Sequence, residues 1–167
     1  MNVEVYKDSI IQVKSDAVVS PGNSFLKPGG GTSKEIFLGA GEEMKKEAEE
    51  LRKLYYPEGI DIGDVVVTNA YNLPFRYVFH TVGPIYGKDD LENIRDCYYN
   101  LLEKAEEKEL SSITMPGISL GVFGVPPDIV ADYAKEVIDN FNFSSLKTIR
   151  FVLAKEKDYR TFLKRFE

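Results

Sequence analysis

The chain has 167 residues, of which 43% are hydrophobic and 29% are charged, as in one domain built around a full core. Its 27 acidic and 21 basic residues give a net charge of -6, which opposes non-specific binding to the phosphate backbone of extended nucleic acid. Its apolar runs are shorter than the roughly 18 to 20 residues that cross a bilayer, and no basic-then-apolar leader precedes them. We therefore expect one soluble, cytoplasmic domain that covers residues 1–167 and has no membrane partner.

Six short runs along the chain have the pattern of strands. Most are rich in β-branched or aromatic residues and are bounded by Gly, Pro, Asn or charge, as buried strands are. They lie at residues 17–19, 65–68, 77–82, 113–115 and 149–153, and residues 2–6 alternate like an edge strand. Helical patterns separate them at residues 42–54, 90–107, 127–140 and 157–166. This order predicts the α/β class, as a three-layer α/β/α sandwich with a central mixed, largely parallel sheet of about six strands.

Cys97 is the only cysteine and His80 is the only histidine. An intrachain disulfide is therefore excluded, and the common Cys/His zinc sites cannot be assembled. His80 lies inside a predicted strand and Cys97 lies on a patterned helix, so we interpret both as buried structural residues rather than as a catalytic pair. We expect neither a metal nor a cofactor.

Two loops that follow predicted strands have unusual chemistry. In open α/β sheets, ligands bind beyond the carboxyl ends of the strands. The first loop contains three successive glycines, Gly29 to Gly31, whose backbone N–H groups a ligand can approach with no Cβ in the way. The second loop, residues 116–126, has three glycines around Ser119 and can turn its amides onto an anion without a lysine. For each loop, a turn-rich connection without a ligand is the alternative.

Tyr71 and Asn72 follow the predicted strand at residues 65–68 and are further candidates. They either line the same site or only pack within their loop.

Four collinear segments resemble a known family, the macrodomains, which bind ADP-ribose. The segments are DAVVSPGNS at residues 16–24, GGG at 29–31, YVFHTVGP at 77–84 and MPGISLGVFG at 115–124. Together they reach over most of the chain. The resemblance implies that the two loops clamp a diphosphate and a distal ribose, while adenine lies near the first strands.

The resemblance also implies which residues bind. Asn23 and Phe123 face the distal ribose, and the diphosphate lies against the second loop. The full set is Asp8, Ser9 and Ile10 near adenine, Ser20, Asn23, Gly30, Gly31, Thr32 and Ser33 in the first loop, and Ser119, Leu120, Gly121, Val122, Phe123 and Gly124 in the second.

The chain departs from the family pattern at four places. Ser9 stands where members have the aspartate that accepts from adenine, and Asp8 serves only if the backbone shifts by one residue. Ser20 replaces the first loop asparagine, and Ala154 replaces an aromatic near adenine. Ser33 replaces the aspartate that orients water in the hydrolytic members, and a serine is a poor general base near neutral pH.

The leading hypothesis is therefore a module that recognises ADP-ribose or an ADP-ribosylated molecule. The first alternative is an ADP-ribosyl hydrolase or O-acyl-ADP-ribose deacylase, in which Asn23 and a ligand-positioned water act in place of the missing aspartate. The second alternative is a divergent macrodomain that binds another nucleotide, an RNA end or a protein. The acidic charge makes extended RNA the least favoured partner.

Overall fold

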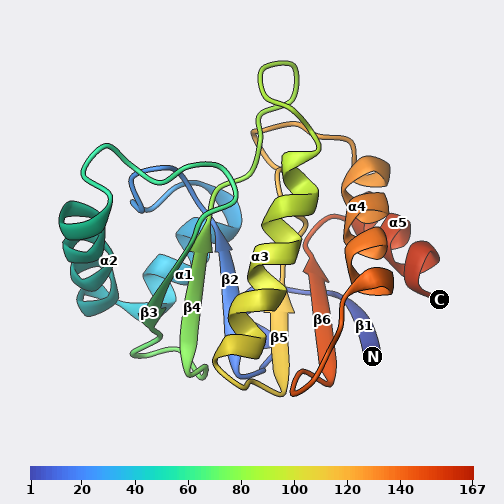
Figure 1. Cartoon of the computed structure of the whole chain (residues 1–167), viewed down its shortest axis with the longest axis horizontal. Coiled ribbons are helices and arrows are strands. Elements are labelled where there is room, and N and C mark those ends of the chain that lie inside the picture. Colours follow the sequence, from blue (N-terminus) through green and yellow to red (C-terminus); the bar gives the residue numbers. More distant parts are fainter.

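The computed structural model describes residues 1–167 and has one six-stranded sheet between two layers of helices (Figure 1). The elements in chain order are β1 (Asn2–Lys7), the 3-10 turn η1 (Ile10–Gln12), β2 (Ala17–Pro21), α1 (Gly31–Ala40), α2 (Glu42–Tyr55), β3 (Val65–Asn69), β4 (Tyr77–Thr81), α3 (Asn93–Glu107), β5 (Ser112–Met115), α4 (Pro127–Asn140), β6 (Thr148–Leu153) and α5 (Glu156–Phe166). The strand order is β1-β6-β5-β2-β4-β3. All neighbouring strands are parallel except β3 and β4.

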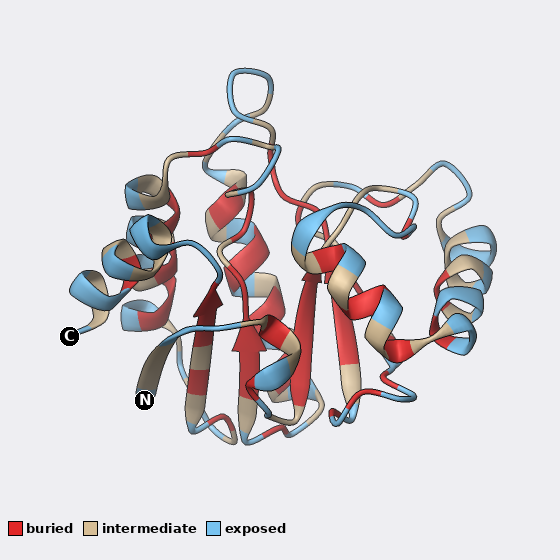
Figure 2. Ribbon diagram, turned by 180° about the vertical axis from the view of Figure 1, so that it is seen from behind, coloured by how far each residue is buried: buried red, intermediate tan, exposed pale blue.

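The two faces of the sheet carry separate apolar clusters, because successive side chains of a strand point to opposite faces. In β2, Ala17 and Val19 join the cluster formed with α3, α4 and α5, whereas Val18 joins the cluster formed with α1 and η1. The central strands are buried on both sides (Figure 2). The predicted α/β/α sandwich and its mixed sheet are confirmed.

Helix α1 is the element that the sequence pattern did not separate from the glycine-rich loop. It begins directly at Gly31 and contains Gly39, and glycine is a weak helix former. Tertiary packing supplies its stability, because Ile36, Phe37 and Ala40 are buried against the sheet. Helix α3 also begins at Asn93 rather than at residue 90, since Asp90 accepts hydrogen bonds from Glu92 and Asn93 in a preceding turn.

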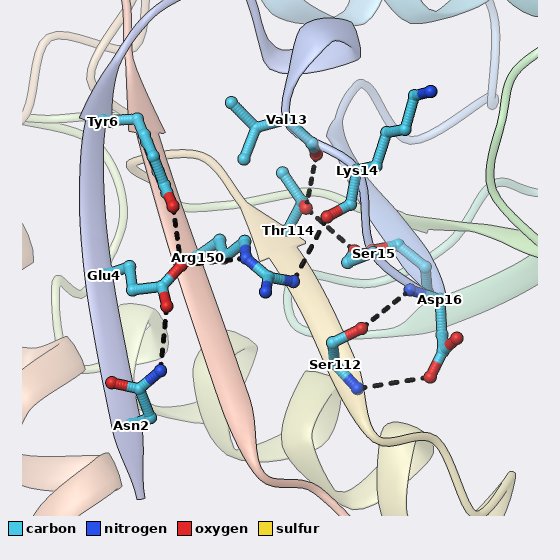
Figure 3. Close-up of polar contacts among 11 residues, drawn as sticks. Asn2, Glu4, Tyr6, Val13, Lys14, Ser15, Asp16, Ser112, Thr114 and Arg150 are labelled. Atoms are coloured by element: carbon cyan, nitrogen blue, oxygen red, sulfur yellow. Dashed lines mark hydrogen bonds and ion pairs between the residues drawn. The ribbon is translucent and has the colours of Figure 1, made fainter.

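A polar network holds the strands in register near the start of β2 (Figure 3). Arg150 of β6 donates to Glu4 of β1 at 2.9 Å and to the Lys14 carbonyl at 3.2 Å. Asp16 accepts the Ser112 N–H at 3.2 Å and donates its own N–H to the Ser112 hydroxyl at 3.0 Å. These bonds connect β1, β6, β5 and β2 at one end of the sheet.

Glu106, in the last turn of α3, holds the segment before β6. Its carboxylate accepts the N–H groups of Ser144, Ser145 and Leu146 at 3.0, 2.8 and 3.0 Å, and the Ser145 hydroxyl at 2.9 Å. Burial opposes ionisation of this carboxyl, but the hydrogen bonds outweigh it and lower its pKa to about 2.

We expect Glu106→Gln to lower the free energy of unfolding by about 1–3 kcal/mol at pH 7, because four donors lose a charged acceptor. The ordinary pKa of the carboxyl is 4.5, so its stabilising effect is present above pH 4.5 and is lost as the pH falls toward 2. Urea denaturation from pH 7 to pH 2 measures this. The exposed neighbour Glu109→Gln is the control, and equal stability of the two variants at pH 7 contradicts the prediction.

Candidate functional site

The two glycine-rich loops leave the same edge of the sheet. Strand β2 ends at Pro21 and β5 ends at Met115, and these strands are parallel neighbours. The first loop (residues 22–30) and the second loop (residues 116–126) therefore both extend beyond the carboxyl ends (Figures 1 and 2). Leu26 of the first loop and Phe123 of the second pack into one apolar cluster with Val82. The structure thus brings together the two segments that the sequence predicts as a site.

Asn23 organises the first loop. Its Oδ1 accepts the N–H groups of Phe25 and Lys27 at 3.0 and 3.3 Å, and its Nδ2 donates to the Lys27 carbonyl at 3.0 Å. Leu26 has a φ of 55°, in the left-handed region that favours glycine. Asn23 therefore stabilises a tight turn within the first loop.

The glycine run presents backbone donors at the start of α1. The N–H groups of Gly30, Gly31 and Thr32 donate to no acceptor in the protein, and no side chain caps this helix end. Gly31 has a φ of 55°, and space is open where a Cβ of Gly30 or Gly31 would lie. The buried Ser33 hydroxyl accepts the Gly29 N–H at 3.4 Å and fixes the run against the helix. Free donors at a helix N-terminus favour an anion.

The second loop presents a longer run of donors. None of the amides of residues 119–123 has an acceptor in the protein, whereas the next two amides, of Gly124 and Val125, bond back to Gly121 and Ser119 at 3.0 Å each. Ser119 has a φ of 65°, which turns the chain at the start of this run. Successive free amides in such a turn form a concave binding surface for an anion.

Tyr98 of α3 anchors the base of the second loop. Its buried hydroxyl donates to the Pro116 carbonyl at 2.9 Å and accepts the Ile118 N–H at 3.0 Å. Burial raises the pKa of this phenol, so it stays protonated as a donor. The sequence does not predict this role, because Tyr98 has the helical spacing of an ordinary core residue.

We expect Tyr98→Phe to lower the free energy of unfolding by about 1–3 kcal/mol, because it leaves the buried Pro116 carbonyl and Ile118 N–H unpaired. Amides of the second loop should then exchange with solvent faster, which hydrogen exchange measures. The exposed Tyr99→Phe is the matched control. Unchanged exchange in the second loop of Tyr98→Phe contradicts the anchoring role.

The residues predicted near adenine lie after β1, at the same edge. The Asp8 carboxylate is exposed and accepts the Ser9 N–H at 2.7 Å, while Ile10 is buried under α1. Burial and the nearby Asp8 carboxylate raise the pKa of Glu35. Ser20 is buried at the end of β2, and its hydroxyl has no hydrogen-bond partner.

His80 and Cys97 are structural, as predicted. His80 Nε2 lies 2.9 Å from the Thr68 hydroxyl, and burial lowers the pKa of the imidazole to about 4. The Cys97 thiol is buried 3.5 Å from the Val82 carbonyl, and burial raises its pKa to about 12. Neither side chain is available as a base or a nucleophile at neutral pH.

The suggestion that Tyr71 and Asn72 line the site is wrong. Strand β3 is antiparallel to β4, so its carboxyl end lies at the edge of the sheet opposite the two loops. There the Asn72 N–H donates to the Ala40 carbonyl at 3.3 Å. The alternative, loop packing without a ligand role, fits this contact with the end of α1.

No helix of the structure combines the length and the apolar character that crossing a membrane requires.

Comparison with known proteins agrees with the geometry. The Macro domain family model matches residues 19–134. A macro domain-containing protein of Caldanaerobacter subterraneus is 33% identical over 169 residues, which cover 99% of this chain and 95% of that protein. An uncharacterised protein of Sulfurisphaera tokodaii is 38% identical over 169 residues, which cover 100% of this chain and 92% of that protein.

Solved structures of the family superpose closely on this chain. The Oceanobacillus iheyensis macrodomain with ADP matches with a TM-score of 0.92 and 33% identity, covering 98% of this chain and 88% of that one. The Trypanosoma brucei macrodomain in complex with ADP-ribose matches with a TM-score of 0.86 and 28% identity, covering 98% of this chain and 68% of that one. On its sequence and its fold alike, the chain belongs to the Macro domain family.

Proposed function

We propose that this protein binds ADP-ribose, either free or as the terminal group of an ADP-ribosylated molecule. The observation that carries the proposal is the run of unused amides at residues 119–123, at the same sheet edge as the unused amides of α1. Two sets of neutral donors suit a diphosphate in a protein whose net charge is -6. The ADP and ADP-ribose bound to related macrodomains support the same ligand class.

Each part of the ligand has proposed partners. The diphosphate lies between the second loop and the start of α1, and the distal ribose lies between Asn23 and Phe123. Adenine lies beside Asp8, Ser9 and Ile10, and Ser20 closes the floor beneath the first loop. The donors for the diphosphate come from Gly30, Gly31, Thr32, Ser33, Ser119, Leu120, Gly121 and Val122, and Gly124 closes the turn by donating its N–H to the Gly121 carbonyl.

Isothermal titration with ADP-ribose, ADP and AMP tests the proposal. We expect saturable binding of ADP-ribose, weaker binding of ADP because the distal ribose is missing, and the weakest binding of AMP because the diphosphate is missing too. Absence of saturable heat at submillimolar ADP-ribose overturns the proposal.

No feature of the site favours the hydrolase over the binding module. Ser33, at the position of the family's catalytic aspartate, is buried and accepts the Gly29 N–H. The polar atoms of Asn23 are bonded within their own loop. Neither residue presents a base to a water molecule.

We expect Asn23→Ala to weaken ADP-ribose binding about 10-fold, because the first loop loses the three internal hydrogen bonds that hold its turn beside the proposed ribose position. Titration calorimetry measures this, with Asn72→Ala at the opposite edge as the control. Incubation with a mono-ADP-ribosylated protein tests turnover in the same variants. Release of ADP-ribose by the unmodified protein and not by Asn23→Ala supports the hydrolase instead.

A further inference from the structure

A groove of about 470 Å³ runs along β3, the last strand of the sheet, between α2 and α3. Its floor is Val65, Val66 and Val67. One wall is Leu51 and Tyr55 of α2 with Tyr56, which directly follows that helix, and the other is Lys104 of α3 with Lys108, which directly follows α3. None of these residues belongs to the two loops, so the groove is separate from the proposed ADP-ribose site.

The floor of the groove is a free strand edge. The Asn69 N–H donates to the Glu47 carboxylate at 2.9 Å, so it points away from β4. Inward and outward groups alternate along an edge strand, so the N–H and C=O groups of Val65 and Val67 also point outward. They have no hydrogen-bond partner in the protein. At Asn69 the outward N–H already has a carboxylate acceptor from α2, whereas Val65 and Val67 leave theirs open.

The walls add apolar surface and positive charge. Tyr55 is 66% exposed, and Leu51 is half-buried beside it. Lys104 and Lys108 are the only charged residues that line the groove, in a chain of net charge -6. Lys104 pairs with Glu107 at 3.0 Å, but both side chains are partly exposed, and such a pair is weak and easily exchanged.

The position of α2 decides what can occupy the groove. Helix α2 stands beside β3 on the left of Figure 1. A second copy of this chain would bring its own α2 and its whole sheet to the edge, whereas an extended peptide brings only one strand. The three residues at the floor correspond to about 10 Å of strand.

We propose that this groove binds an extended peptide segment of another protein, which pairs with β3 as an added strand and places acidic side chains on Lys104 and Lys108 and apolar ones on the α2 wall. Backbone pairing supplies affinity in such complexes, and side-chain pockets supply specificity. The protein then holds an ADP-ribosyl group and a peptide on separate surfaces.

A fluorescein-labelled, acetylated and amidated peptide with the sequence Glu-Val-Tyr-Val-Glu is the probe, and Lys-Val-Tyr-Val-Lys is its control. We expect saturable binding of the acidic peptide alone by fluorescence polarisation. At saturation, the Val65 and Val67 amides should exchange at least 10-fold more slowly. A version N-methylated at alternate amides keeps every side chain but loses backbone donors, and should bind at least 10-fold more weakly.

The double variant Lys104→Glu with Lys108→Glu should also lose at least 10-fold in affinity for the acidic peptide, while Lys45→Glu on the exposed face of α2 should not. Neither change should alter ADP-ribose binding, so failure here is distinguishable from failure of the proposed function. Equal binding of the acidic and basic peptides, or of the N-methylated and plain peptides, overturns the proposal. No saturation up to about 1 mM, or a dimer of the chain that the double variant abolishes, overturns it too.

Discussion

A Gly121→Glu substitution is expected to weaken ADP-ribose binding at least 100-fold, which corresponds to about 2.7 kcal/mol. The glycine lies in the middle of the five unused amides, and nothing lies within 4 Å of the place its Cβ would take. The fold therefore accepts the side chain, but a carboxylate now lies where the diphosphate would be. Calorimetry gives the affinity, and thermal melting should show an unchanged midpoint.

Val122→Glu is the matched control for this prediction. Val122 is 97% exposed. Its replacement by glutamate adds the same charge one residue along the loop but directs that charge to solvent. We expect a loss of less than about 10-fold, because solvent screens an exposed charge. Equal affinities of the two variants would show that the second loop does not hold the diphosphate.

Acidification from pH 7 to pH 4 is expected to remove about 3 kcal/mol of stability through His80 alone. Burial lowers the pKa of this imidazole from 6.5 to about 4. Below pH 6.5 the unfolded chain binds a proton on this imidazole that the folded chain does not bind. The stability that neutral His80 contributes is therefore complete above pH 6.5 and is lost as the pH falls through 4. About 2 kcal/mol of the loss should be complete by pH 5.

Urea denaturation of the protein and of His80→Gln, measured at intervals from pH 7 to pH 5, tests this. The chain has no other histidine. The variant should therefore lose the fall in unfolding free energy with pH that His80 causes between pH 7 and pH 5, whatever its stability at pH 7. A glutamine also keeps a polar group for the Thr68 hydroxyl, which lies 2.9 Å from Nε2 of the histidine. Parallel pH profiles of the two proteins contradict the assignment.

The layers of the fold could be predicted because strand and helix patterns differ in period and length. The direction of β3 could not be taken from its own residues, since a buried run such as Val65 to Val67 is the same in either direction. The length of the connection between β3 and β4 does indicate the direction. Only residues 70–76 separate β3 from β4, and a parallel crossover needs a dozen residues or more.

The candidate site was predicted from glycine runs and family motifs, and its two loops do share one edge of the sheet. The motifs could not predict the hydrogen-bond partner of each polar atom. Asn23 has the motif position of a ligand contact, but its side chain is bonded to Phe25 and Lys27. Tyr98 supports the second loop from a helix outside its motif, and only three-dimensional packing reveals such a partner.

The donors at the start of α1 and in the second loop are peptide groups, which carry no formal charge and do not titrate. A ligand held in this way releases few counter-ions on binding, so its dissociation constant should change little with ionic strength. Selection among phosphorylated metabolites then depends on their shape. Long polyanions gain no binding energy from additional phosphates, because the net charge of -6 repels them.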